Sequence, residues 1–383
     1  MRILHIIDSG SLYGAEKALL ALAEAHRFNG LDVEIACMAE SNIPTTPLEF
    51  EAEKLRLKWR RFTIASGPDL RGIITICKYA GATRTSVLHS HGYKANILLA
   101  LLPRFIRQIP ALATLHGWTS INRWERTKFY ERLERMLLNR LDSVVACSDA
   151  MVNAFSLDQR LGTRLTVIHN GIECRSAKTL HNPNDLAQTR SEIKKFIGSR
   201  IPFVFAGRIS PEKDLQNCIR AFHIATGDTR SDLCLIVFGD GPERQSAKQL
   251  VRQLDMTERI LIWGYCEYLS GVLDLFRALV ISSVTEGIPI VAMEAMRAEI
   301  PVIATRVGGL PELVVSGKTG LLVPCGDEKS LADAIIKLAN DSKFASDMGI
   351  EGLQRLQSEF DIEKVASGYF GQYQKIVQQN SSR

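Results

Sequence analysis

Short apolar runs alternate with longer stretches of helical periodicity along nearly the whole chain. Apolar runs of this length are typical of strands that are buried on both faces of a parallel sheet. In the first half of the chain the predicted strands are residues 3–7, 33–38, 87–89, 111–115, 143–146 and 166–169. In the second half they are residues 203–206, 233–238, 259–263, 279–282, 302–304 and 320–323. Strands that alternate with helices favour an α/β fold with two doubly wound parallel sheets.

The chain divides at a polar segment, residues 173–200, which is predicted to be a linker that leads into a short helix. A chain of 383 residues suits two domains, because single hydrophobic cores rarely grow beyond about 250–300 residues. We therefore expect an N-terminal domain over residues 1–172 and a C-terminal domain over residues 173–360, with a final helix after them. Doubly wound sheets bind ligands outside the carboxyl ends of their strands, so the cleft between the two domains is the expected site.

Composition narrows the classes of protein that fit. Eight cysteines stand singly, and their spacing predicts neither a zinc cluster nor a disulfide framework, which indicates reduced thiols and a cytoplasmic protein. The first strand is too soon broken by Asp8 to be a secretion signal, and no apolar run approaches the ~20 residues that span a bilayer. Residues 1–170 carry 22 Lys and Arg against 16 Asp and Glu, whereas the rest carries 25 against 26. This surplus is too small to predict nucleic-acid binding.

The most informative segment holds two acids, Glu286 and Glu294. It continues an apolar run, residues 278–284, that is predicted to be a buried strand. Gly287 then breaks the pattern, and Pro289 suits the first turn of a helix. Amides at a helix start attract phosphate, and carboxylates on either side can accept hydrogen bonds from sugar hydroxyls, so the segment predicts a nucleotide-sugar site. The alternative is an ordinary helix start, where acids are common because they favour the helix dipole.

A second strand-to-helix turn, residues 206–214, carries Arg208 and Lys213. Gly207 permits the close approach of a backbone, and the two cations could reach one anion, Arg through its planar fork and Lys as a point charge. The alternative is a solvated loop that happens to be charged. We favour an anion site, because this turn and the Glu286 segment leave strand ends in the same half of the chain.

Candidate residues of the N-terminal half are weaker when taken singly. Gly14 lies between the first strand and the first helix, where it could bring an amide near a phosphate or form a plain tight turn. His116 follows a predicted strand and is either a structural or a catalytic histidine. His89 and His91 have a spacing that could suit a metal, but no third ligand is apparent, so we favour structural or acceptor contacts.

No Asp-x-Asp occurs in the sequence, although a metal that bridges a donor's phosphates would usually need clustered carboxylates. Arg208, Lys213 and helix amides can neutralise a diphosphate without such a metal. We therefore expect no metal and no cofactor, with the nucleotide-sugar as a substrate.

These segments together resemble the retaining glycosyltransferases of family 4, the glycosyl transferases group 1. The resemblance covers nearly the full length, and four segments in the correct order make it highly specific. It is carried by Phe205 through Lys213, Phe238-Gly239-Asp240-Gly241-Pro242, Glu286 through Met296, and Pro301 through Gly309, with further support from Val167 through Ile172. The family has the GT-B fold, so the resemblance implies two Rossmann-like domains that face a central cleft.

The resemblance also implies residue roles. Arg208 and Lys213 would hold the donor diphosphate, Glu294 would bind the ribose hydroxyls, and Glu286 would bind the donor sugar. His116 would lie beside the transferring sugar. The remaining donor contacts would come from Gly14, from Gly207, from the loop Gly264-Tyr265-Cys266 beside the base, and from the backbone of Gly287, Ile288, Pro289 and Ile290. A C-terminal helix, residues 361–383, would pack back on the N-terminal domain, which would bind the acceptor.

Two positions depart from the family's pattern. The family usually has Gly-Gly where this chain has Tyr13-Gly14, and it usually has a glycine where Glu299 stands. We interpret the second glycine as structural rather than chemical.

The implied reaction is transfer of a sugar from a nucleoside diphosphate to an acceptor hydroxyl, with the anomeric configuration retained. Arg208, Lys213 and the helix start would stabilise the leaving diphosphate. No residue stands out as a covalent nucleophile, so front-face attack is the simpler hypothesis. The alternatives are a sugar-nucleotide epimerase of the GT-B type and a non-catalytic GT-B protein that binds partners. A nicotinamide oxidoreductase is poorly supported, because no Gly-x-Gly-x-x-Gly follows the first strand.

Two basic and aromatic runs, residues 123–136 and 54–61, bear on the acceptor. Such surfaces can lie on anionic lipid, which would place the protein at the inner face of a membrane. A lipid-linked glycan or a lipopolysaccharide precursor would then be the natural acceptor, in lipopolysaccharide, capsule or other cell-surface glycan biosynthesis. The alternative is an ordinary crossover helix with a solvated charged face.

Overall fold

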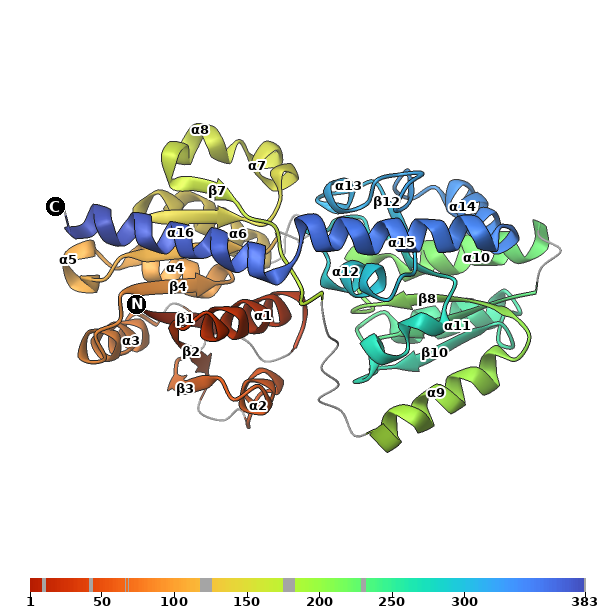
Figure 1. Ribbon diagram of the computed structural model, residues 1–383, viewed down its shortest axis with the longest axis horizontal. Helices are drawn as coiled ribbons and strands as arrows, with labels where there is room; N and C mark the ends of the chain where they lie inside the picture. The colour runs from red at the N-terminus through yellow and green to blue at the C-terminus, as the bar shows by residue number, and fades with distance from the viewer. Residues whose placement is uncertain are drawn as a thin grey trace. The chain divides into compact units, whose positions relative to one another are not determined.

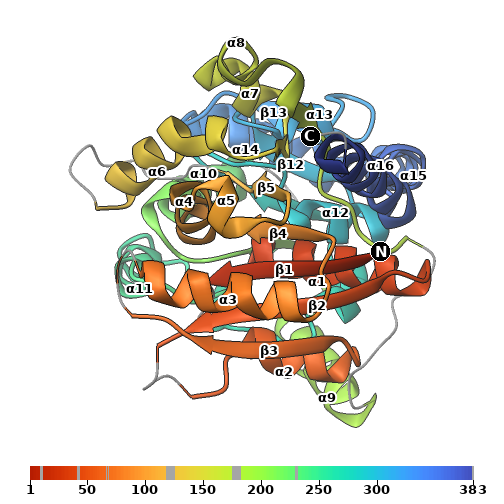
Figure 2. The ribbon, with the colours of Figure 1, turned by 90° about the vertical axis from the view of Figure 1, so that its left-hand side faces the viewer.

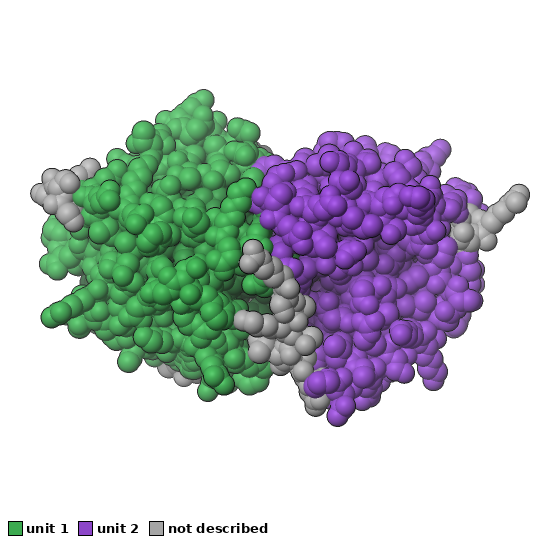
Figure 3. Space-filling model, in the orientation of Figure 1, with its two compact units in different colours: residues 1–173, 360–383 green, residues 174–359 purple. Residues whose placement is uncertain are grey.

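The computed structural model describes residues 1–8, 12–40, 44–65, 67, 69–117, 126–174, 183–228 and 232–381. The chain forms two compact units, unit 1 with Met1–Glu173 and Phe360–Arg383 and unit 2 with Cys174–Glu359 (Figure 3). Each unit is an α/β structure around one parallel sheet, as the hydrophobic pattern predicts. In the described parts of the chain, no helix is both long and apolar enough to cross a membrane.

The sheet of unit 1 has the strand order β3-β2-β1-β4-β5-β6-β7, and all neighbouring strands are parallel. Figure 2 shows β3, β2, β1, β4 and β5 in this order. Its strands are β1 (Arg2–Asp8), β2 (Asp32–Ala39), β3 (Lys58–Thr63), β4 (Val87–His91), β5 (Ala111–Leu115), β6 (Ser143–Ala146) and β7 (Leu165–Val167). The order reverses between β1 and β4, which is the doubly wound arrangement. Such sheets open a crevice at the carboxyl ends of the two strands that flank the reversal.

Helices cover both faces of this sheet. The core on one face is shared with α1 (Gly14–Phe28), α2 (Pro47–Lys54) and α16 (Ile362–Ser381). The core on the other face is shared with α3 (Leu70–Ala82), α4 (Tyr93–Leu101), α6 (Arg126–Leu137), α7 (Asp149–Phe155) and α8 (Leu157–Leu161). The short helices α5 (Arg104–Arg107), η1 (Leu138–Arg140) and η2 (Gly162–Arg164) complete the unit. The C-terminal helix α16 lies beside α1 and buries side chains against β1, β4 and β5 (Figure 1).

The hydrophobic pattern missed β3, which forms one edge of the sheet. Among its six residues only Phe62 is buried, so the strand lacks the apolar run that marks the central strands. The basic run at residues 54–61 therefore does not form a lipid-facing helix, because it contains the end of α2 and the start of β3. Charged residues on an edge strand also oppose pairing with another chain. One of them, Arg61, pairs with Glu49 of α2.

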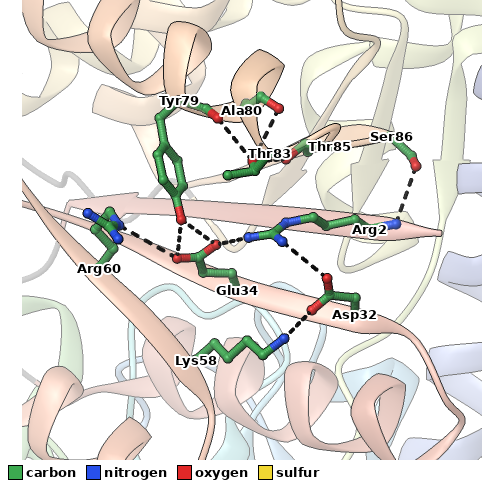
Figure 4. Close-up of polar contacts among 10 residues, drawn as sticks. All are labelled: Arg2, Asp32, Glu34, Lys58, Arg60, Tyr79, Ala80, Thr83, Thr85 and Ser86. Atoms are coloured by element: carbon green, nitrogen blue, oxygen red, sulfur yellow. Dashed lines mark hydrogen bonds and ion pairs between the residues drawn. The ribbon is translucent and has the colours of Figure 1, made fainter.

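Polar side chains at the amino ends of β1, β2 and β3 hold these strands together (Figure 4). Glu34, whose side chain is 7% exposed, accepts hydrogen bonds from Arg2 at 2.5 Å and from the Tyr79 hydroxyl of α3 at 2.7 Å. Asp32 contacts Arg2 at 3.2 Å and Lys58 at 2.8 Å, and the hydrogen bond from Lys58 lowers its pKa. These ion pairs lie at the opposite end of the strands from the expected ligand crevice, so we interpret them as structural.

The sheet of unit 2 has the order β10-β9-β8-β11-β12-β13, again with parallel neighbours. Its strands are β8 (Ile201–Ala206), β9 (Leu233–Phe238), β10 (Ile260–Gly264), β11 (Ala278–Ile281), β12 (Val302–Thr305) and β13 (Gly320–Val323). The order reverses between β8 and β11, so unit 2 repeats the arrangement of unit 1.

The helices of unit 2 follow the same crossover pattern. They are α9 (Pro183–Ile197), η3 (Pro211–Lys213), α10 (Leu215–Asp228), α11 (Arg244–Gln253), η4 (Leu269–Gly271), η5 (Leu273–Leu275), α12 (Ile290–Arg297), α13 (Leu310–Leu313), α14 (Glu328–Asn340) and α15 (Ser342–Glu359). Part of the predicted linker, residues 175–182, lies outside the described residues. The helix after it, α9, has 15 residues and is longer than the short helix that we expected. Helix α12 packs against β11, β12 and α15.

Glu299 follows the C-cap residue of α12, Ala298, and has a left-handed conformation with φ at 57°. The amide of Glu299 bonds to the carbonyl of Met296 and the amide of Ile300 bonds to the carbonyl of Ala295, both at 3.1 Å. This is the Schellman pattern, which usually places glycine at the left-handed position. The glycine that family 4 has here is therefore explained by the backbone. A side chain in this conformation costs about 1–2 kcal/mol.

We expect Glu299→Gly to unfold with a free energy at least as high as the native protein, and about 1 kcal/mol above that of Glu299→Ala. Alanine keeps the strained Cβ, so the pair of variants isolates the backbone effect from loss of the carboxylate. Urea unfolding of the native protein and the two variants measures the order of their free energies of unfolding. Greater stability of the alanine variant, as is normal at an ordinary helix position, would contradict the left-handed assignment.

Candidate active site

Two loops of unit 2 meet where the strand order reverses. The loop after β8, residues 207–214, and the loop after β11, residues 282–289, are joined by direct hydrogen bonds. The amide of Val284 donates to the carbonyl of Glu212 at 2.9 Å. The hydroxyl of Ser282 donates to the carbonyls of Lys213 at 3.0 Å and Asp214 at 2.8 Å. The two segments that sequence reasoning singled out are therefore neighbours at the carboxyl edge of the sheet.

Lys213 and Glu286 form an ion pair between these loops. The Lys213 ammonium contacts Oε1 of Glu286, and the same oxygen accepts a hydrogen bond from the Ser283 hydroxyl at 2.7 Å. The two side chains are only 23% and 7% exposed. A pair that is mostly removed from water needs such additional hydrogen bonds to offset desolvation. Sequence reasoning gave these two residues separate roles and did not predict that they pair.

Glu294 lies on α12 and is buried. Its Oε1 accepts a hydrogen bond from the Ser270 hydroxyl at 3.2 Å. Pro289 is the residue that precedes the helix rather than part of its first turn, and Ile288 and Ile290 are both buried beside it. Glu286 and Glu294 therefore contact different groups on either side of the start of α12. Neither serine was predicted as a site residue, although Ser283 stands at a strand end where such a residue is informative.

Glycines allow the strand-end loops to approach closely. The amide of Gly207 donates to the carbonyl of Phe238 at 3.0 Å, and the amide of Gly239 donates to the carbonyl of Gly264 at 2.7 Å. A Cβ on Gly239 would lie 1.8 Å from the carbonyl oxygen of Gly207, and a Cβ on Gly308 would lie 1.8 Å from the carbonyl oxygen of Glu286. Side chains at these two positions would therefore force the loops apart.

The loop after β10 was predicted to line a nucleotide base. Gly264 is buried, whereas Tyr265 is 66% exposed and Cys266 is half-buried. Arg244 reaches this loop, since a Cβ on Gly264 would lie 3.2 Å from its Nη2, and its Nη1 contacts Asp240 at 3.2 Å. Arg244 was not predicted; it is the first residue of α11 and lies four positions after Asp240, which belongs to the loop before that helix.

The other predicted donor residues are placed as follows. Arg208 is exposed in the loop after β8, and the carbonyl of Gly287 accepts from the amide of Gly309 at 3.1 Å. In unit 1, Gly14 is the first residue of α1, and a Cβ there would meet nothing within 4 Å. Residues 9–11 of the loop before it, and residues 118–125 after the His116 strand, lie outside the described residues.

His116 follows β5 at the carboxyl edge of unit 1, is half-buried, and contacts a group of buried histidines. Its Nε2 lies 3.0 Å from Nδ1 of His91, and Nε2 of His91 lies 2.9 Å from Nδ1 of His5. Alternate residues of a strand point to one face, so positions 5, 89, 91 and 114 of the paired strands share the face that α1 and α16 cover. Sequence reasoning noted His89 and His91 but missed His5, which the parallel register places opposite His89.

A second set of contacts ties this group to α16. His89 lies 2.7 Å from the Tyr373 hydroxyl and 2.7 Å from the Thr114 hydroxyl. The Thr114 hydroxyl is 3.0 Å from that of Tyr369. The C-terminal helix therefore completes a polar network in the core of unit 1.

Burial keeps these imidazoles neutral. Desolvation lowers the pKa of His5 to about 3 and that of His116 to about 4. It also holds the pKa values of His89 and His91 well below their usual range. At neutral pH each ring therefore offers one hydrogen-bond donor and one acceptor.

The chemistry that these groups can perform differs between the units. Unit 2 has cationic side chains, a helix start and two carboxylates, a combination suited to an anion flanked by hydroxyl groups. Unit 1 has neutral imidazoles, which exchange hydrogen bonds with uncharged oxygens.

Comparison with known families agrees with this chemistry. Residues 13–176 match the family model described as Glycosyltransferase Family 4, and residues 188–355 match the model described as Glycosyl transferases group 1. The N-acetyl-alpha-D-glucosaminyl L-malate synthase of Bacillus anthracis is 27% identical over 316 residues, which cover 82% of this chain and 81% of the relative. The UDP-Gal:alpha-D-GlcNAc-diphosphoundecaprenol alpha-1,3-galactosyltransferase of Escherichia coli is 21% identical, over 95% of this chain and 94% of that protein.

A solved structure supports the same fold. Anabaena Alr3699/HepE, crystallised in complex with UDP-glucose, superposes with a TM-score of 0.80 at 22% identity, and the match covers 100% of both chains. Two consecutive family models thus account for most of the sequence, and the fold agrees with theirs. The chain belongs to the glycosyltransferases of family 4, whose C-terminal half is the group 1 domain and whose fold is GT-B.

Proposed function

We propose that this glycosyltransferase transfers a sugar from a nucleoside diphosphate to an acceptor hydroxyl and retains the anomeric configuration. The observation that carries the proposal is the Lys213–Glu286 pair at the strand reversal of unit 2, next to the start of α12. It supplies a cation for the diphosphate and a carboxylate for sugar hydroxyls in one place. The relatives support a nucleotide-sugar donor, because the Escherichia coli protein is named for UDP-Gal and the Anabaena structure contains UDP-glucose.

Lys213 can contact Glu286 and a donor phosphate at the same time. An ammonium group has three N–H donors, so it can keep its contact with Glu286 and still donate to a phosphate oxygen. Negative charge grows on the leaving diphosphate as the glycosidic bond breaks, and Lys213, Arg208 and the amides at the start of α12 would stabilise it. Glu294 would bind the ribose hydroxyls, and His116 of unit 1 would contact the transferring sugar. This charge stabilisation needs no metal, so we propose a metal-independent reaction.

The acceptor proposal rests on α6. Phe129 and Met136 are 66% and 61% exposed, and Arg132 and Arg140 are exposed at positions that continue the same stripe of the helix and of η1. Basic and apolar side chains together suit the surface of an anionic bilayer. Two other residues of α6 do not face outward, because Glu134 is buried against Asn96 and Arg135 stacks on Phe155. We propose that this stripe holds the protein against the membrane for a lipid-linked acceptor in cell-surface glycan synthesis.

The donor and the stereochemistry can be tested together. We expect one class among UDP-, GDP- and ADP-sugars to raise the unfolding temperature, and the product made from an α-linked donor to be α-linked by NMR, in the presence of EDTA. Incubation with the donor alone should give no epimer. A β-linked product, an epimerised donor, or activity that EDTA abolishes would each contradict part of the proposal.

Removal of the cations should depress turnover. We expect Lys213→Ala to lower kcat about 100-fold or more, and Arg208→Ala to lower it in the same direction, because charge on the leaving group is then less well stabilised. Lys343→Ala is the matched control, since Lys343 forms an exposed pair with Asp347 in the same unit and should leave kcat unchanged. Unchanged kinetics in the Arg208→Ala/Lys213→Ala double variant would refute this assignment.

Membrane contact can be measured by flotation with vesicles that contain anionic lipid. We expect the native protein to float at low salt, and the Phe129→Ser/Met136→Ser variant to lose most of this binding because the apolar part of the stripe is gone. Ile350→Ser removes an exposed apolar side chain from unit 2 and serves as the control. Absence of flotation for the native protein at low salt would exclude the membrane role.

A further inference from the structure

We infer that the buried chain His5–His91–His116 fixes the tautomer of His116 and presents its Nδ1 as a hydrogen-bond donor to an oxygen of the bound sugar. His91 is the positioning residue of this chain, because it contacts both other rings. The identity of the ligand rests on the proposed function, whereas the tautomer is a property of the free protein.

The geometry places the chain at the ligand edge of unit 1. His5 is on β1 and His91 is the last residue of β4, and these are the two strands between which the order reverses. His116 follows β5, the next strand of the sheet. The three histidines therefore extend from the buried middle of β1 to the carboxyl edge of the sheet, where doubly wound sheets bind their ligands.

A count of protons shows that the two hydrogen bonds among the three histidines must be donated in the same direction. Three neutral imidazoles have three N–H groups and three bare nitrogens. The contacts His5 Nδ1 to His91 Nε2 and His91 Nδ1 to His116 Nε2 use two of each. The remaining nitrogens are Nε2 of His5 and Nδ1 of His116, and neither forms a hydrogen bond with a protein atom of the described residues. One of them must carry the third proton, and which nitrogen carries it determines the tautomer of all three rings.

The surroundings of His5 decide the direction. A buried N–H without an acceptor is rarer in proteins than a buried acceptor without a donor. His5 is completely buried, so its Nε2 is better left bare than protonated. His5 then donates to His91, His91 donates to His116, and the third proton resides on Nδ1 of His116. Nδ1 of His116 is a buried atom as well, but His116 is half-buried as a residue and lines a small cavity together with His91, His169 and Tyr369, whereas His5 does not line it.

A metal site in the same cluster fits less well. His5, His89 and His91 each have a ligand atom within 4.8 Å of the others. However, both nitrogens of His89 already contact hydroxyls, those of Tyr373 and Thr114. The facing nitrogens of His5 and His91 are 2.9 Å apart, which is closer than the roughly 3.3 Å expected between two ligands of a tetrahedral zinc. A direct hydrogen bond explains this distance.

The test is the nitrogen-15 spectrum of the histidine side chains in the free protein, with the His116 signals assigned by their loss in His116→Asn. We expect native His116 to show the neutral form protonated at Nδ1. In His91→Leu the single tautomer should give way to a mixture. His91→Asn should restore it, because an asparagine amide nitrogen occupies the place of Nδ1 and can donate to His116.

Tyr373→Phe is the matched control, since it removes a contact of His89 in the same core and should leave the His116 tautomer unchanged. With a donor identified, His91→Leu should lower kcat/KM on the order of 10-fold and His91→Asn should recover most of it, because one hydrogen bond is lost and regained. Native His116 protonated at Nε2, or Zn²⁺ shifting the signals of His5, His89 and His91 together, would overturn the inference. Absence of transferase activity would refute the proposed function and leave the spectrum to decide this one.

Discussion

The Lys213–Glu286 ion pair is the interaction on which the site of unit 2 depends. It spans the two loops that flank the reversal of strand order, and its residues are 73 positions apart in the chain. Removing two charges from water costs several kcal/mol, which their mutual attraction and the hydrogen bond from Ser283 must offset. A stabilising role alone does not explain such a pair, because apolar residues of the same size would serve at least as well. The proposed site, which would hold a cation against an anionic ligand, would explain it.

The core of unit 1 also buries polar side chains, but these are uncharged. Four imidazoles with lowered pKa values, those of His5, His89, His91 and His116, occupy a face that otherwise carries Ile3, Val87 and Leu112. Polar groups in a core are costly unless their hydrogen bonds are satisfied. In the series His5–His91–His116, Nε2 of His5 and Nδ1 of His116 lack a partner among the described residues. Departures of this kind from an apolar core are expected at functional sites.

Much of the architecture could be predicted from the sequence, because central parallel strands are short apolar runs between helical patterns. β3 could not, since an edge strand with Lys58 and Arg60 facing outward has no such run. The candidate residues Lys213, Glu286 and Glu294 were predicted from their places after strands, but their partners were not. A hydrogen bond between residues far apart in sequence depends on register and loop geometry, as the contact of Ser270 with Glu294 illustrates. His5 is an intermediate case, because strand periodicity would have placed it on the face of His89 once the strand order was known.

The two units use one arrangement of strands for opposite electrostatic purposes. Both sheets reverse at the equivalent position, between β1 and β4 and between β8 and β11. Unit 2 places a charged pair there, whereas unit 1 places imidazoles that burial keeps neutral. A cation in unit 1 would also attract the diphosphate that we propose as a ligand of unit 2. A neutral N–H donor can form a hydrogen bond with a hydroxyl and binds a phosphate less strongly than a cation does. Under the proposed function, burial of the histidines would favour a sugar over a phosphate beside unit 1, because it removes a positive charge there.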